Sequence, residues 1–93
     1  MRIVVAGAGQ LGYSIASLLS EEGMDVVVVD GVSKQLEAAK TTLDVLTVEA
    51  NIASPITMND PDINSADILI AVTESDEVNI VACVLAKKHG IRH

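Results

Sequence analysis

The feature that most constrains the fold of this chain is a short apolar run that ends in a set of spaced glycines. Ile3 to Ala6 carry no polar side chain and lead directly into a Gly-x-Gly-x-x-Gly motif. Such a run is typical of a strand buried on both faces of a parallel sheet. Between a strand and a helix, this glycine spacing permits a tight turn and lets bare backbone approach a pyrophosphate. The motif therefore predicts a phosphate-binding loop made of Gly7, Ala8, Gly9, Gln10, Leu11 and Gly12.

Strands and helices are expected to alternate along the rest of the chain. Strands are predicted at 3–6, 25–30, 45–48 and 68–72, and helices at 10–22, 33–42 and 73–88. A short helical turn should begin near Pro55 and stop at Pro61, while Gly23 and Gly90 stand where left-handed helix caps belong. This alternation implies right-handed crossovers. It predicts an α/β, Rossmann-like parallel sheet in the order 3-2-1-4 with helices on both faces.

The apolar residues of the helices predict which faces are buried. The inner face of the first helix is expected to hold Leu11, Ile15, Leu18 and Leu19, and that of the second Val32, Leu36, Ala39 and Leu43. The last helix is apolar nearly all the way round from Val78 to Ala86. One side can pack on the sheet, so we expect the other to meet another subunit or a further segment.

Residues 1–93 are expected to form a single nucleotide-binding domain. The fourth predicted strand is apolar on both faces, as an interior strand would be, yet no fifth strand follows it. An interior strand left at a sheet edge exposes unpaired backbone groups. We therefore expect the chain to be a C-terminally truncated fragment of a longer protein, the alternative being a partner chain that covers this edge.

Composition excludes several classes of function. The formal net charge of −7 argues against nucleic acid as a partner, because binding a phosphate backbone needs a basic face. The single cysteine, Cys83, excludes a disulfide framework and fits a reducing cytoplasm. His89 and His93 have no carboxylate at ligand spacing, so no metal site is expected. The sequence also has no Ser-His-Asp set, Cys-His pair or Walker lysine motif, and we predict that the chain is not an enzyme.

Asp30 is the most informative polar residue outside the glycine motif. It ends the second predicted strand, eighteen residues beyond Gly12. A carboxylate at this place can accept hydrogen bonds from both hydroxyls of an adenine-linked ribose. Its negative charge disfavours a 2′-phosphate and hence NADP. Asp30 does not separate NAD(H) from ATP or ADP, which share the ribose diol.

Two further segments follow strands and face the same edge of the predicted sheet. After the third strand, Asn51 could reach an adenine edge and Ile52 could pack on its face, although Asn51 also fits a plain turn. After the fourth strand, Val72, Thr73 and Glu74 lie across the switch point from the glycine loop, where ligands bind in such sheets. Thr73 with Asp76 resembles a helix capping box, so these polar residues also have a structural explanation.

The chain resembles the TrkA-N domain family, also called RCK or KTN domains. The resemblance runs over nearly all of the sequence, through RIVVAGAGQLGYSIASLL, DVVVVD, LDVLTVEANIASP and ADILIAVTESDEVNIVACVLAKK. Two departures stand out. The family usually has Gly-Asp or Gly-Asn after the third strand, where this chain has Glu49-Ala50-Asn51, and Asn59-Asp60-Pro61 interrupts its third helix.

The resemblance implies a cytoplasmic regulatory subunit, peripheral to a membrane-embedded potassium transporter or channel of the Trk or Ktr type. Such domains bind NAD(H), or ATP and ADP, and the ligand changes the packing of domains in a homo-oligomer. The resemblance assigns the phosphates to Gly7, Gly9 and Gly12, and the adenosine ribose to Asp30. It places the adenine beside Asn51 and Ile52, and the far side of the ligand beside Thr73 and Glu74.

Two other functions stay open from the residues. The same glycine motif and Asp30 occur in the NAD-binding coenzyme domain of an oxidoreductase, which would need a catalytic half elsewhere. The apolar last helix would also suit an oligomerisation module with no ligand at all.

Overall fold

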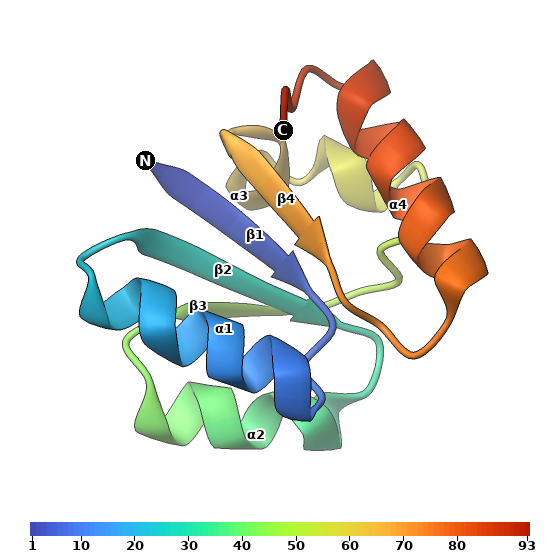
Figure 1. Ribbon diagram of the computed structural model, residues 1–93. Coiled ribbons are helices and arrows are strands. Elements are labelled where there is room, and N and C mark those ends of the chain that lie inside the picture. The colour runs from blue at the N-terminus through green and yellow to red at the C-terminus, as the bar shows by residue number, and fades with distance from the viewer.

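Four parallel strands in the order β3-β2-β1-β4 form the centre of the molecule, which confirms the predicted topology. The computed structural model describes residues 1–93 (Figure 1). The strands are β1 (Arg2–Ala6), β2 (Asp25–Asp30), β3 (Leu46–Glu49) and β4 (Ile68–Ala71). The helices are α1 (Gln10–Glu21), α2 (Ser33–Thr42), the 3-10 turn η1 (Thr57–Asn59), α3 (Pro61–Asn64) and α4 (Asp76–Lys88).

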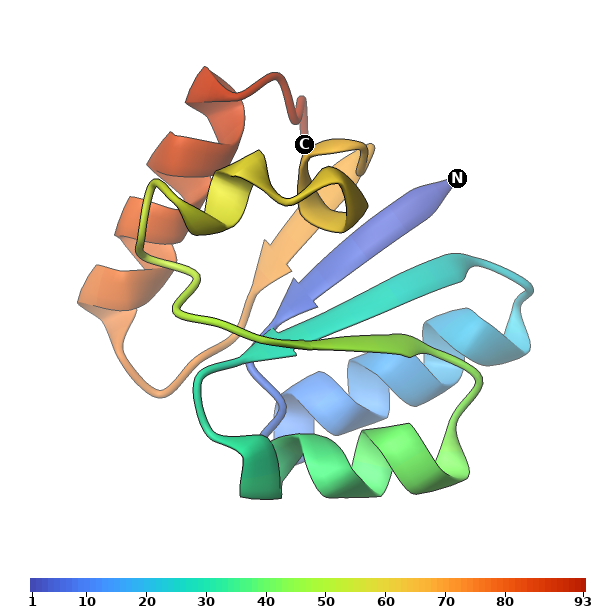
Figure 2. The ribbon, with the colours of Figure 1, turned by 180° about the vertical axis from the view of Figure 1, so that it is seen from behind.

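The helices cover both faces of the sheet. Figure 1 shows α1 and α2 on one face, and Figure 2 shows α3 and α4 on the other. The residues of β2 alternate between the two faces, because successive side chains of a strand point in opposite directions. Val26 and Val28 pack with Leu36 under α1 and α2, whereas Val27 and Val29 pack beneath α3 and α4. The two core layers are therefore built from valine, leucine, isoleucine and alanine, with Met58 as the one methionine.

The register brings the carboxyl ends of all four strands to one edge of the sheet. Ala6 pairs with Val29 of β2 on one side and with Ala71 of β4 on the other. Asp30 in turn pairs with Glu49 of β3. The loops that carry the predicted site residues therefore leave the sheet from neighbouring positions.

The inner faces of α1 and α2 differ from the prediction at three positions. Leu11 and Leu18 are 61% and 63% exposed, and the residues of α1 that are buried are Gly12 and Ala16. Small residues face the sheet because Gly12 lies directly against the turn at Gly7, which leaves no room for larger side chains there. Val32 is also exposed, because it precedes α2 with an extended backbone rather than forming part of the helix.

The short helical turn predicted near Pro55 is η1, which ends before Pro61 as expected. The interruption expected at Asn59-Asp60-Pro61 is also present, because Asp60 has an extended backbone between η1 and α3. Pro61 then begins α3, a second short helix that was not predicted. Proline is tolerated at this position because the first N–H groups of a helix have no partner within the helix. The Asp60 side chain accepts a hydrogen bond from the backbone N–H of Asp62 at 2.9 Å and so caps the short helix.

The last helix begins at Asp76, three residues later than expected, and Thr73 does not cap it. Its N-cap is Ser75, whose hydroxyl accepts a hydrogen bond from the Val78 N–H at 3.2 Å. Gly90, with φ of 97°, terminates the helix as predicted, as Gly23 does after α1 with φ of 80°. None of the helices combines the length and hydropathy needed to cross a membrane.

The segment after α4 turns back toward β4. The backbone N–H of Leu69 donates a hydrogen bond to the carbonyl oxygen of His93 at 2.7 Å. One position on the outer edge of β4 is therefore paired, so the edge is less open than the sequence alone suggested. Ile91, which is part of this segment, is buried and extends the core under α4.

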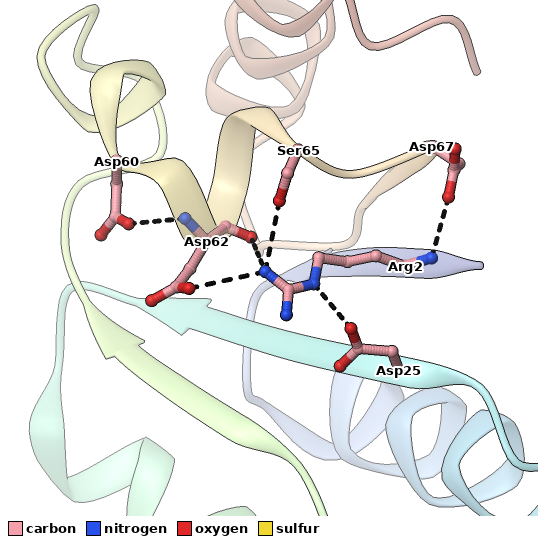
Figure 3. A network of polar contacts seen from close by, with 6 residues as sticks. All are labelled: Arg2, Asp25, Asp60, Asp62, Ser65 and Asp67. Atoms are coloured by element: carbon pink, nitrogen blue, oxygen red, sulfur yellow. Dashed lines mark hydrogen bonds and ion pairs between the residues drawn. The ribbon is translucent and has the colours of Figure 1, made fainter.

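Arg2 joins three elements at the amino end of the sheet, opposite the carboxyl ends (Figure 3). Its guanidinium donates to the Asp25 carboxylate of β2 at 2.8 Å and contacts Asp62 of α3 at 3.5 Å. It also donates to the Ser65 hydroxyl at 3.2 Å, while its backbone N–H bonds to the carboxylate of Asp67. The hydrogen bond to Asp25 raises the pKa of Arg2 above its ordinary value.

Candidate functional site

A cavity of about 250 Å³ lies at the carboxyl ends of the strands. In a doubly wound sheet this edge is where ligands bind, at the point where the strand order reverses. Eight of the predicted site residues line it: Gly7, Gly9, Asp30, Asn51, Ile52, Val72, Thr73 and Glu74. The fold therefore brings together residues from the loops that follow all four strands.

The three motif glycines have different reasons to be glycine. Gly7 has a φ of 115°, and a Cβ there would stand 2.8 Å from the Val72 carbonyl oxygen. A Cβ on Gly12 would stand only 1.7 Å from the carbonyl oxygen of Gly7. A Cβ on Gly9 would meet nothing closer than the Gln35 side chain at 3.7 Å, an ordinary contact. The fold itself requires Gly7 and Gly12, whereas no contact within the chain requires glycine at position 9.

Asp30 is bound to the glycine turn through its side chain. One carboxylate oxygen accepts a hydrogen bond from the backbone N–H of Ala8 at 2.9 Å, and the other accepts from that of Val32 at 2.8 Å. These bonds hold the carboxylate at the floor of the cavity. Each oxygen keeps acceptor capacity for a further donor, because an ionised carboxylate offers about four lone-pair sites.

The segment after β3 contributes one polar residue and one core residue. Asn51 accepts a hydrogen bond from the Ala53 N–H at 3.0 Å, which is the turn role left open by the sequence. The amide NH2 of Asn51 makes no hydrogen bond within the chain and can still donate to a ligand. Ile52 is 5% exposed and belongs to the core under α3 and α4, so only a small part of it borders the cavity.

Asn79 of α4 holds the loop that follows β4. Its side-chain oxygen accepts from the Thr73 N–H at 2.9 Å and from the Thr73 hydroxyl at 2.6 Å, and its NH2 group donates to the Thr73 carbonyl at 3.2 Å. The Ser75 N–H donates to the Thr73 hydroxyl at 3.2 Å. Thr73 thus borders the cavity, but its hydroxyl is engaged in fixing the loop. Asn79 lies in one of the segments that carry the family resemblance. Its role could not be predicted from the sequence, because its contact with Thr73 forms only when α4 packs on β4.

The other predicted residues lie beside the cavity rather than in it. Gln10 and Leu11 line an adjoining hollow that shares Gly9, Val72, Thr73 and Glu74 with the main cavity. Ala8 contributes its backbone N–H to Asp30, and Gly12 is buried against Gly7. Five residues that were not predicted as site residues also line the cavity, which are Val29, Gly31, Gln35, Ala50 and Val78. Gly31 and Ala50 directly follow strand ends, a signal that could have identified them, whereas Gln35 and Val78 lie one turn inside helices.

The side chains that line the cavity carry negative charge only. Its titratable side chains are two carboxylates, Asp30 and Glu74, and no lysine, arginine, histidine or cysteine lines it. No group of three or more potential metal-ligating side chains occurs in the chain. Backbone N–H groups at the start of α1 are the positive end of a helix dipole and suit an anion.

Comparison with known proteins decides the family. The TrkA-N domain matches residues 3–92 of this chain. The chain belongs to the TrkA-N domain family. Its relatives include the Trk system potassium uptake protein TrkA of Haemophilus influenzae, 40% identical over 83 residues, which are 89% of this chain and 18% of that protein. The TrkA homolog 1 of Methanosarcina mazei is 48% identical over 89 residues, 94% of this chain and 21% of that protein.

The chain thus spans about a fifth of the length of these TrkA relatives. The TrkA-N domain is a non-enzymatic regulatory domain, which confirms the prediction that this chain is not an enzyme. The resemblance stated from the sequence is confirmed as well.

Two solved structures share the Rossmann-like fold of this TrkA-N domain. The Kef CTD of Shewanella denitrificans in its AMP-bound form has a TM-score of 0.76 at 19% identity and covers 96% of this chain and 53% of that chain. The UDP-glucose 4-epimerase of Thermotoga maritima has a TM-score of 0.74 at 20% identity. The match covers 98% of this chain and 35% of the epimerase chain. A TrkA-N domain and an epimerase share this fold, so the fold alone does not decide function.

Proposed function

We propose that this domain binds an adenine nucleotide, NAD(H) or ATP and ADP, and acts as a regulatory domain of a potassium-uptake system. The observation that carries the proposal is the bond between Asp30 and the N–H of Ala8. It sets a carboxylate that can accept from a ribose diol directly beside a glycine loop that can approach phosphates. Both features face one cavity, which Asn51 also lines.

The ligand class follows from the donors and acceptors present. Asp30 accepts from the two ribose hydroxyls, and the backbone of Gly9 and the start of α1 receive the phosphates. The free amide NH2 of Asn51 donates to an acceptor on the adenine edge. A 2′-phosphate would place negative charge against the Asp30 carboxylate, so NADP and NADPH are disfavoured. AMP is a further candidate, since the fold neighbour Kef CTD is named in an AMP-bound form.

The role of the bound nucleotide is regulatory. The TrkA relatives are named as potassium uptake proteins, and the cavity holds no catalytic set. We therefore assign the domain to the cytoplasm, peripheral to the inner face of the membrane, where it contacts a Trk- or Ktr-type potassium transporter or channel. Nucleotide binding shifts the population of domain arrangements and thereby gates transport.

We also propose that the domain acts as a homo-oligomer, in which α4 forms the contact between subunits. Ile80 and Val84 on its outer face are 64% and 52% exposed, and Val81 and Cys83 lie exposed beside them. Ala82 and Ala86 occupy the opposite face and are buried against the sheet. An apolar strip of this kind on a surface helix is typical of a subunit contact.

Calorimetric titration of the purified protein with NADH, ATP, ADP, AMP and NADPH tests the nucleotide site. At least one of the first four should bind, and NADPH should bind at least about 10-fold more weakly than NADH. Asp30→Ala should weaken binding of the preferred ligand by about 10- to 100-fold, since charge-assisted hydrogen bonds contribute about 1.5–3 kcal/mol each.

The matched control is Asp44→Ala, which removes an exposed carboxylate that makes no hydrogen bond and lies outside the cavity. It should leave the affinity unchanged. Tight NADPH binding, or equal affinities of Asp30→Ala and the unchanged protein, would contradict the site. Failure of every nucleotide to bind would favour the oligomerisation module.

A further inference from the structure

We propose that Glu74 is a specificity-determining residue that selects against nucleotides carrying a long phosphate chain. This selectivity rests on the nucleotide site proposed above. Glu74 lines the main cavity and also the adjoining hollow beside Gln10 and Leu11. The two spaces share Gly9, so a phosphate chain that lies on the glycine loop and extends along either of them passes Glu74. A third hollow beside Gly9, toward Tyr13 and Gln35, is not lined by Glu74.

The Glu74 carboxylate forms no ion pair within the chain. Both ion pairs of the chain involve Arg2, which lies at the opposite end of the sheet (Figure 3). Lys87, Lys88 and Arg92 belong to the last turn of α4 and the segment after it. Lys34 and Lys40 are exposed on α2, and neither lines the cavity nor the adjoining hollow. A phosphate on the glycine loop therefore meets backbone N–H groups and two carboxylates, with no cationic side chain.

Asp30 and Glu74 differ in what their charge does. The Asp30 carboxylate is held by two backbone N–H donors and lies at the ribose end of the site. Glu74 is exposed and accepts no hydrogen bond from the chain, so its charge acts on whatever anion approaches. Each phosphate added to a nucleotide brings further negative charge to the Glu74 side.

The backbone on both sides of Glu74 is fixed. Thr73 is held through its N–H, carbonyl and hydroxyl by Asn79, and the Ser75 N–H bonds to the Thr73 hydroxyl. Ser75 also caps α4 through Val78. The backbone that carries Glu74 is therefore held beside the glycine turn, and only rotation of the side chain itself moves the carboxylate. Discrimination by a placed like charge is a recognised means of specificity.

The test compares ATP with AMP, measured by titration calorimetry at low ionic strength and without divalent cations. Glu74→Gln keeps the size of the side chain and removes its charge. It should tighten ATP binding by about 3- to 10-fold, as expected for one like-charge contact near a surface, and change AMP binding by less than about 2-fold. The matched control Glu77→Gln removes an exposed carboxylate in the first turn of α4 that lies outside the cavity, and it should change neither affinity.

Added salt should reduce the difference between the unchanged protein and Glu74→Gln, because ions screen exposed charges. Equal effects on AMP and ATP, or no effect on either, would overturn the selectivity while leaving the nucleotide site intact. Weaker binding of Mg²⁺-bound ATP by Glu74→Gln would overturn it too, because Glu74 would then act as a cation ligand. If the unchanged protein bound no nucleotide, the proposed function itself would fail.

Discussion

The Asp30 carboxylate accepts a hydrogen bond from the backbone N–H of Ala8 at 2.9 Å, which ties the end of β2 to the glycine turn after β1. The same carboxylate receives the Val32 N–H at 2.8 Å and so also orients the entry to α2. One side chain therefore organises two of the loops that line the cavity. Its loss should affect both the stability of the fold and ligand binding.

Asp30→Asn tests the contribution of Asp30 to the stability of the fold. The asparagine oxygen can replace only one of the two acceptor positions, so we expect a loss of about 1–2 kcal/mol in the free energy of unfolding. Urea denaturation followed by circular dichroism measures this loss, with Asp44→Asn as the exposed control. An unchanged midpoint would mean that the second acceptor position of Asp30 contributes nothing to stability.

Gly12→Ala and Gly9→Ala should differ sharply. A Cβ at position 12 would overlap the Gly7 carbonyl oxygen, and backbone cannot rotate aside as a side chain does. We expect Gly12→Ala to destabilise the fold by about 3 kcal/mol or more, at the upper end of overpacking costs.

Gly9→Ala, in contrast, should leave the melting temperature within about 2 °C, because the added methyl group meets only the Gln35 side chain. Nucleotide affinity should nevertheless fall by about 10-fold or more, since the methyl group would stand between backbone and phosphate. Thermal melting and calorimetry on the same samples give both values. A Gly9→Ala protein that binds normally would remove the phosphate role of this residue.

Asn79→Ala should loosen the loop after β4. It removes three hydrogen bonds to Thr73, and the Thr73 N–H is left without its partner. A loss of about 1–3 kcal/mol in the free energy of unfolding is expected, because part-buried donors would be unsatisfied. Hydrogen exchange should show faster exchange at the Thr73 and Ser75 amides. Protection equal to that of the unchanged protein would mean that packing of α4, rather than Asn79, holds the loop.

Arg2→Gln should lower the melting temperature by the same amount across neutral pH. The pKa of Arg2 is raised by its hydrogen bond to Asp25, and a raised pKa gives stability that is fully present below the ordinary value. That stability is lost only as the pH rises through the higher value of the folded state. Between about pH 6 and 9 the difference should therefore stay constant, and it should shrink with salt. If the difference in melting temperature between the two proteins changed steeply with pH in this range, another titrating group would be responsible for the effect.

Val84→Glu should weaken self-association through α4. Val84 is exposed on the outer face of the helix, so the substitution disturbs no core contact. Buried in a subunit contact, the new charge would favour dissociation, and sedimentation should show a shift toward the monomer. The matched control Glu77→Gln on the same helix should leave association unchanged. An unchanged protein that is already monomeric at all concentrations would contradict the proposed contact.

Much of the fold could be predicted from local patterns. The four valines of β2, the glycine motif after β1 and the apolar run of β4 each have one favourable local structure, and their alternation with helices leaves few topologies. The residues at strand ends, such as Asp30 and Asn51, could be assigned to one edge because all parallel strands end there. The exposure of Leu11 and Leu18 could not be predicted, because spacing along a helix does not reveal how closely that helix approaches the sheet.

What the sequence by itself determined was the order of the strands, the glycine turn and the edge at which Asp30 stands. These depend on short-range patterns and on the handedness of crossovers. Only the tertiary structure decided that Gly12 must lie against Gly7, that Asn79 holds Thr73, and that no cationic side chain joins Glu74 in lining the cavity. Those relationships join residues that approach one another only when the helices pack on the sheet, and no spacing along the chain encodes the distances between them.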